Sequence, residues 1–182
     1  MFLLILVALG LGRALGDDRL PGPSRTVSAR LAAGGQRAVV EPLYVTLARF
    51  LCGEADHHAQ DYAALLWTMQ RRADAVPGLT LRATVLGYSM PLLGHGGARG
   101  EWVRALPGEF PTRVYRTTWD RAVKYAQTFL RGELPDPCAS VTNHFGSPAD
   151  MAINYPNAVH IECSSMPGKP TVNVFFLEQV LH

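Results

Sequence analysis

The strongest constraint on how this chain folds is a stripe of apolar side chains between positions 43 and 54. The larger apolar residues recur at Leu43, Leu47, Phe50 and Leu51, which is the spacing of one face of an α-helix. Continuing this series by three residues reaches Glu54. The sequence therefore predicts a helix with one buried face whose last turn carries a carboxyl group on that same face.

The predicted burial of Glu54 has a chemical consequence. A carboxylate among apolar side chains is costly to ionise, and no lysine lies nearby in the sequence, so we expect its pKa to rise from about 4.3 toward about 6. An acid that keeps its proton near neutral pH can protonate the leaving oxygen of a glycosidic bond. Gly53 predicts close approach by another segment or a ligand. The alternative is that Glu54 faces water beyond the helix end.

Further helices and a pair of short strands follow. Asp61 lies in the first turn of a predicted second helix that ends before Pro77, and Thr80 begins a shorter one through Tyr88. The Gly-rich and Pro-rich stretch up to about residue 115 reads as a long loop. A capping box at Thr117 and Asp120 then predicts a helix that ends near residue 132. Segments 157–163 and 171–176 read as a β-hairpin, so we expect a mainly α, α+β domain with a small C-terminal hairpin or sheet.

The N-terminal segment predicts export. The run at residues 1–12 has roughly the dozen apolar residues of a signal-peptide core rather than the about 20 that span a bilayer. We interpret residues 1–16 as a signal peptide or, because no basic residue precedes the run, a short uncleaved anchor. Residues 17–40 read as a flexible linker and residues 41–182 as one folded domain. The destination would be the periplasm, the cell wall or the extracellular medium.

The cysteines and the net charge narrow the class of protein. Three cysteines fit one disulfide, predicted between Cys138 and Cys163, and one buried thiol at Cys52. The formal charge of +2 is too small for a nucleic-acid-binding surface. We expect a monomer without a cofactor or a metal, whose contact with a membrane is limited to an uncleaved N-terminal segment.

Three stretches resemble the cell-wall hydrolase family that contains the spore-cortex lytic enzymes. LARFLCGEA followed by AALLWTMQRRAD is similar to that family's apolar helix with a Gly-Glu-Ala step and its next helix, which ends in Asn-Arg. TTWDRAVKYAQTFLRGELPDPCASVTNHFG resembles the family's W-x-x-A…A…G…DP segment. The resemblance covers roughly residues 43–147 in order. One departure is that Gln70-Arg71 or Arg71-Arg72 stands in place of Asn-Arg.

The resemblance implies a lysozyme-like fold related to goose-type lysozyme and lytic transglycosylases, with the glycan strands of peptidoglycan as substrate. It assigns Glu54 as the acid, which later acts as base. The GYSMP turn resembles a Tyr-Ser-x-Pro element of wall hydrolases and suggests Tyr88 and Ser89 as cleft residues, although a simple helix end explains the turn equally well. Transglycosylation by the sugar's own hydroxyl and hydrolysis by water both remain open.

Other candidate site residues come from the polar, aperiodic run TNHFGSP. His144 could bind an N-acetyl group or orient the departing sugar, and Phe145 could stack on a sugar ring. Asn143 and Ser147 are further substrate-binding candidates. A second carboxylate would distinguish the mechanisms, and the sequence leaves its identity open among several acids: Glu101, Glu109, Asp120, Asp136 and Asp150.

Three readings from other classes stay open. A cysteine peptidase acting on peptidoglycan stem peptides would use Cys52 with His144 or His160 as base, although a thiolate is favoured at the opposite end of a helix. The string around His57 and His58 suggests a metal site, but its spacing fits an exposed polar turn better. A non-catalytic wall-binding or virion-structural protein could keep the same fold.

Overall fold

The computed structural model describes residues 41–95, 103 and 113–177. The predicted signal peptide or anchor, the linker, and two of the second-carboxylate candidates, Glu101 and Glu109, lie outside these residues. Most of the predicted long loop before residue 113 does so as well. Within the described part of the chain, none of the helices has both the length and the apolarity needed to cross a bilayer.

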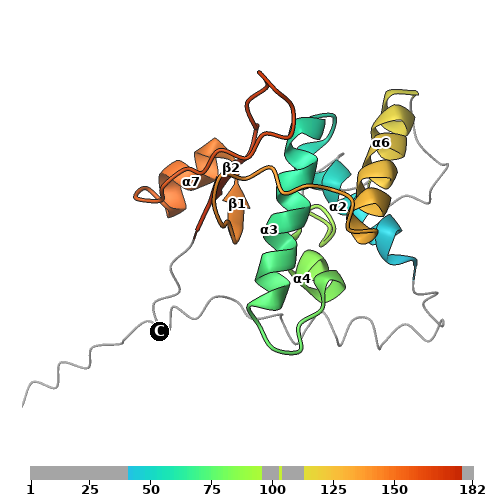
Figure 1. The fold of residues 1–182 in the computed structure, drawn as a ribbon, viewed down its shortest axis with the longest axis horizontal. Helices are drawn as coiled ribbons and strands as arrows, with labels where there is room; N and C mark the ends of the chain where they lie inside the picture. Colours follow the sequence, from blue (N-terminus) through green and yellow to red (C-terminus); the bar gives the residue numbers. More distant parts are fainter. Residues whose placement is uncertain (1–40, 96–102, 104–112, 178–182) are drawn as a thin grey trace, which may run out of the picture.

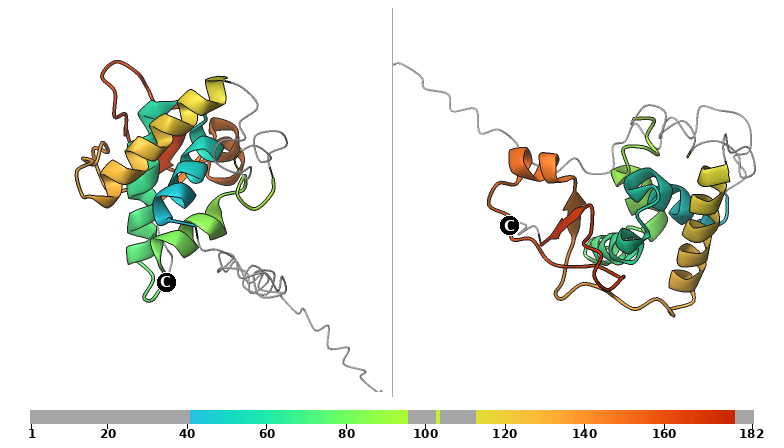
Figure 2. Two further views of the ribbon diagram at one scale, coloured as in Figure 1. Left: turned by 90° about the vertical axis from the view of Figure 1, so that its right-hand side faces the viewer. Right: turned by 90° about the horizontal axis from the view of Figure 1, so that it is seen from above.

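Helices form most of the described domain. They are α2 (Leu43–Ala55), the 3-10 turn η1 (Ala59–Asp61), α3 (Tyr62–Asp74), α4 (Leu81–Tyr88) and α6 (Arg113–Leu130). Helix α3 runs through the middle of the molecule, with α6 on one side and the small sheet on the other (Figure 1). Seen from above, the sheet and α7 (Pro148–Asn154) stand apart from α2 and α6 (Figure 2, right). Helix α3 therefore lies between the sheet and α6 (Figure 1).

The apolar stripe of α2 forms the centre of the core. Leu47, Phe50 and Leu51 are fully buried, as the helical spacing predicted, and α2 packs most extensively against α6. The side chains that meet this stripe come from α3 and α6 and are also buried: Tyr62, Leu65, Leu66, Met69, Trp119, Ala122 and Ala126. Burial of these apolar faces, more than helix propensity, fixes the arrangement of the helices.

The start of α6 differs from the prediction. The helix begins at Arg113, so Thr117 and Asp120 lie inside it and do not form a capping box. Tyr115 is half-buried against the core, one helical turn before the buried Trp119. Because the apolar stripe extends upstream to Tyr115, packing against the core favours an earlier helical turn over the local capping signal.

The small sheet confirms the predicted fold class, but its pairing differs from the predicted hairpin. Strand β1 (His144–Gly146) pairs antiparallel with β2 (Val174–Phe176), with Phe145 opposite Phe175. The segment 157–163 contributes a single bridge from Ile161 to Phe175. Both phenylalanines of β2 are fully buried, whereas Val159 is 77% exposed. Strand β1 brings a buried aromatic contact to Phe50 through Phe145, which the 157–163 segment cannot supply.

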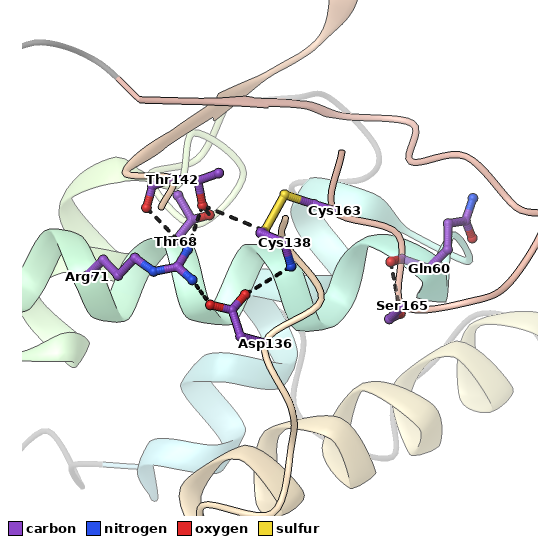
Figure 3. The surroundings of a disulfide bond; sticks show 8 residues. All are labelled: Gln60, Thr68, Arg71, Asp136, Cys138, Thr142, Cys163 and Ser165. Carbon is purple, nitrogen blue, oxygen red and sulfur yellow. Dashed lines mark hydrogen bonds and ion pairs between the residues drawn. A yellow bond between two sulfur atoms is a disulfide. The ribbon is translucent and has the colours of Figure 1, made fainter. Parts of the chain in front are cut away.

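A disulfide joins Cys138 to Cys163, the pair that the sequence suggested, and Cys52 remains a buried free thiol. The bond connects the segment after α6 to the segment after α7 beside α3 (Figure 3). Polar contacts to α3 flank it on the Cys138 side. Arg71 donates to the Thr142 hydroxyl at 2.7 Å and forms an ion pair with Asp136. This face of α3 therefore holds the irregular part of the chain in place.

Candidate functional site

A cleft of about 610 Å³ lies between the helical part and the sheet. Five of the predicted site residues line it, and they come from α2, α4, β1 and the start of α7: Glu54, Tyr88, His144, Phe145 and Ser147. Ser89 is fully buried and contacts Glu54, while Asn143 contributes its backbone carbonyl to Arg72. The structure thus gathers five of the seven predicted residues around one cleft, although they are separated by up to 93 positions in the chain.

Glu54 occupies the last turn of α2 and is half-buried. The Ser89 hydroxyl donates a hydrogen bond to its Oε1 at 2.6 Å. Gly53 allows the turn that carries Ser89 to approach the end of α2, because a Cβ atom at position 53 would lie 2.8 Å from Pro91 Cβ. The close approach predicted for Gly53 is therefore made by Pro91. This packing holds the turn after α4 close to the end of α2 and places Ser89 beside the carboxyl group of Glu54.

Arg72 organises the opposite part of the cleft, although the sequence had not assigned it a role in the site. Its Nη1 lies 2.6 Å from His144 Nδ1 and also donates to the Asn143 carbonyl at 3.1 Å. Its guanidinium carbon lies 3.7 Å from the centroid of the Tyr88 ring, which is a cation–π distance. Of the three candidates in the Asn-Arg position, Arg72 is the one that lines the cleft. Gln70 bonds Asp74 instead, and Arg71 faces the disulfide.

The contact with Arg72 fixes the state of His144. A guanidinium group can only donate, so Nδ1 accepts and the single ring proton of the neutral imidazole belongs on Nε2. Burial, followed by the charge of Arg72, lowers the pKa of His144 from 6.5 to about 4. At neutral pH the ring is therefore an uncharged hydrogen-bond donor. Its neighbours Tyr155 and Phe176, at centroid distances of 5.1 and 4.8 Å, hold the ring within an aromatic cluster.

Asp61 and Asn173 form a second network that the sequence did not reveal. Asp61 is fully buried and accepts hydrogen bonds from the backbone amides of Val172 and Asn173 and from Asn173 Nδ2. Burial raises the pKa of Asp61, and these three donors oppose that shift. Asn173 lines the cleft and also donates to the Glu54 carbonyl at 3.4 Å. Asp61 was interpreted only as a first-turn residue, and Asn173 precedes a strand without any local signal.

Asp150 is the only second-carboxylate candidate within the described residues that lines the cleft. Its carboxylate accepts from the Ser147 hydroxyl at 2.5 Å, and its backbone amide donates to Ser147 Oγ at 3.1 Å. Ser147 is thus the N-cap of α7 as well as a cleft residue. Asp136 forms an ion pair with Arg71, and Asp120 is exposed on α6.

The arrangement of Cys52 argues against thiol chemistry. Its side chain is fully buried, burial raises the pKa of the thiol, and it does not line the cleft. His160, one of the bases considered for it, is exposed. His57 is exposed too, and among the described residues no three His, Cys, Asp or Glu side chains cluster as metal ligands would.

Comparison of the chain with protein-family models, curated proteins and solved structures finds no match.

Proposed function

We propose that this chain cleaves the glycan strands of peptidoglycan, with Glu54 as general acid and then base, as a lytic transglycosylase or a muramidase. The observation that carries the proposal is the position of Glu54. A carboxyl group at the end of a buried helix, half-buried in a large cleft and hydrogen-bonded by Ser89, is suited to protonating a leaving oxygen. The ordered sequence resemblance to cell-wall hydrolases supports the same role.

The surroundings of Glu54 suit a glycan. The hydrogen bond from Ser89 to Oε1 fixes the carboxyl rotamer and favours the acidic proton on the other oxygen. Tyr88 and Phe145 offer aromatic rings on which sugars stack, and His144 offers a neutral N–H donor for an N-acetyl group or a hydroxyl. None of these roles needs a cofactor.

The second step has two candidate nucleophiles. The sugar's own hydroxyl would give an anhydro product with Glu54 acting as base, whereas water would give hydrolysis. Asp150 lines the cleft and would be the residue to hold such a water. An exported enzyme would meet this substrate in the periplasm, the wall or the medium, or as part of a virion. The N-terminal apolar run and the disulfide support that location.

The test replaces Glu54 with glutamine, which keeps the shape of the side chain but donates no acidic proton. Glu54→Gln should lower the release of muropeptides from purified walls by about 100- to 10,000-fold while the protein stays folded. Glu133→Gln, at an exposed glutamate after α6, is the matched control and should cleave like the wild type. Normal clearing of walls by Glu54→Gln would refute the proposal.

Mass spectrometry of the products distinguishes the remaining readings. Anhydro-muramyl ends indicate transglycosylation, reducing ends indicate hydrolysis, and free stem peptides would indicate a peptidase instead. Binding to walls without any released product would indicate a non-catalytic protein.

A further inference from the structure

The buried carboxylate of Asp61 has an unusual set of partners. All three donors lie in two consecutive residues: Val172 N contacts Oδ1 at 3.0 Å, and Asn173 N and Nδ2 contact Oδ2 at 2.8 and 2.9 Å. Burying a charged group is costly unless donors are arranged around it. Here the arrangement includes both the backbone and the side chain of Asn173. Asp61 therefore fixes the conformation of a residue that lines the cleft.

The amide of Asn173 can adopt only one of its two orientations in this network. Its NH₂ group faces two acceptors, Asp61 Oδ2 at 2.9 Å and the Glu54 carbonyl at 3.4 Å. Rotating the amide by half a turn would set its oxygen against both of them, which is unfavourable. The amide oxygen of Asn173 then lies on the opposite side of the amide group and points away from Asp61. Since Asn173 is half-buried and lines the cleft, that oxygen is available to a ligand.

We propose that Asn173 is a substrate-binding residue whose amide oxygen accepts a hydrogen bond from a hydroxyl or acetamido N–H of the glycan, and that Asp61 is the residue that positions it. This inference rests on the proposed function and names a contact within the same cleft. Asn173 directly precedes β2 and its amide contacts the backbone of Glu54. The acceptor is therefore held beside the residue assigned as the acid.

Asn173 complements the donor at His144. Val174 pairs with Gly146 in the sheet, so Asn173 lies one step beyond that end of the pairing and His144 lies at the other end. Three strand residues span about 10 Å. The donor at His144 and the acceptor at Asn173 would therefore contact different parts of the bound glycan strand.

The experiment measures binding in a background that does not cleave. Glu54→Gln protein is titrated calorimetrically with soluble peptidoglycan glycan strands freed of their stem peptides, and the affinity is compared with that of Glu54→Gln/Asn173→Ala. Loss of the acceptor should weaken binding about tenfold, as expected for one hydrogen bond to a ligand. Glu54→Gln/Asn157→Ala, at an exposed asparagine outside the cleft, should bind like the parent.

Asp61→Asn tests the positioning role, with Asp74→Asn at an exposed aspartate as control. If Asp61 acts through Asn173, the variant carrying both Asp61→Asn and Asn173→Ala binds no more weakly than Asn173→Ala alone. A purely structural carboxylate would give additive losses and overturn the positioning role. Should Asp61→Asn not fold, the Asn173→Ala comparison still decides whether position 173 contacts the ligand.

Unchanged affinity in Asn173→Ala, or no binding by any variant, overturns the proposal. These outcomes are separate from the cleavage test. If Glu54→Gln still cleaves walls, the proposed function is wrong even when Asn173→Ala weakens binding. If Glu54→Gln is inactive but Asn173→Ala binds normally, only the present inference fails.

Discussion

Arg71 and Arg72 are neighbours in sequence, but they serve two different faces of α3. Arg71 contacts Thr142 and Asp136 beside the disulfide, where a covalent bond and an ion pair hold irregular segments (Figure 3). Arg72 faces the cleft and contacts His144 and the Tyr88 ring. Successive residues of a helix point about 100° apart, so one helix end serves both faces. The difference suggests that substitutions on the disulfide face lower stability, whereas substitutions on the cleft face lower stability and activity together.

The largest effect is expected for Arg72→Met. The change removes the hydrogen bonds from Arg72 to the Asn143 carbonyl and His144 Nδ1 and the cation over Tyr88, so the free energy of unfolding should fall by about 3 kcal/mol. Because the His144 ring loses its orientation, muropeptide release by the folded enzyme should fall at least about tenfold. Denaturant unfolding and initial rates measure the two effects. Arg71→Met is the matched control. It should lose about 1 kcal/mol of stability and keep a nearly normal rate of muropeptide release. Equal losses of activity in both variants would refute the assignment of Arg71 to the disulfide face and of Arg72 to the cleft face.

Removal of the disulfide should affect stability alone. Replacing both Cys138 and Cys163 by serine releases a cross-link between residues 25 positions apart, which should lower the free energy of unfolding by about 3 kcal/mol. The specific activity of the folded variant at low temperature should match that of the wild type, because neither cysteine lines the cleft. A folded double variant that releases muropeptides slowly would show that the cross-link shapes the cleft.

A smaller effect should appear in the dependence of stability on pH. The pKa of His144 is about 4 in the folded protein against 6.5 when unperturbed, so the unfolded state binds the proton first as the pH falls. The contribution of His144 to stability is complete above pH about 6.5 and is lost progressively toward about 4. The full shift corresponds to about 3 kcal/mol, and partial exposure of the ring to solvent reduces the loss to on the order of 2 kcal/mol. His144→Gln, which keeps an acceptor for Arg72 but does not titrate, should flatten this part of the profile. His160→Gln, at an exposed histidine, should leave the wild-type profile unchanged.

The sequence predicted the elements that depend on local periodicity. The stripe from Leu43 to Leu51, the short helix after Thr80 and the helix that ends before Pro77 all appear as expected, because neighbouring residues determine them. Glu54 followed from the same periodicity. What failed was pairing between distant segments, since nothing near Phe175 in the sequence indicates that its principal partner is Phe145.

The same limit applies to the site. His144 and Phe145 could be predicted because their segment is polar and aperiodic, whereas Arg72 was named only as part of the departure from the Asn-Arg step. Asn173 acquires its place only through contacts with Asp61 and Glu54, at separations of 112 and 119 residues. A single sequence carries no local trace of such contacts.

The long separation between Glu54 and Asn173 has a consequence for the order of assembly. Helices α2, α3 and α6 can pack together before the C-terminal segment is made, but the cleft is incomplete until β2 pairs with β1. The contact between Asn173 and Glu54 joins residues 119 positions apart, and such non-local contacts form slowly compared with a helix. We therefore expect a chain shortened before Asn173 to contain the acid on a formed helix without a binding groove beside it. During synthesis or refolding, activity should therefore appear only after the three residues of β2 have paired with β1.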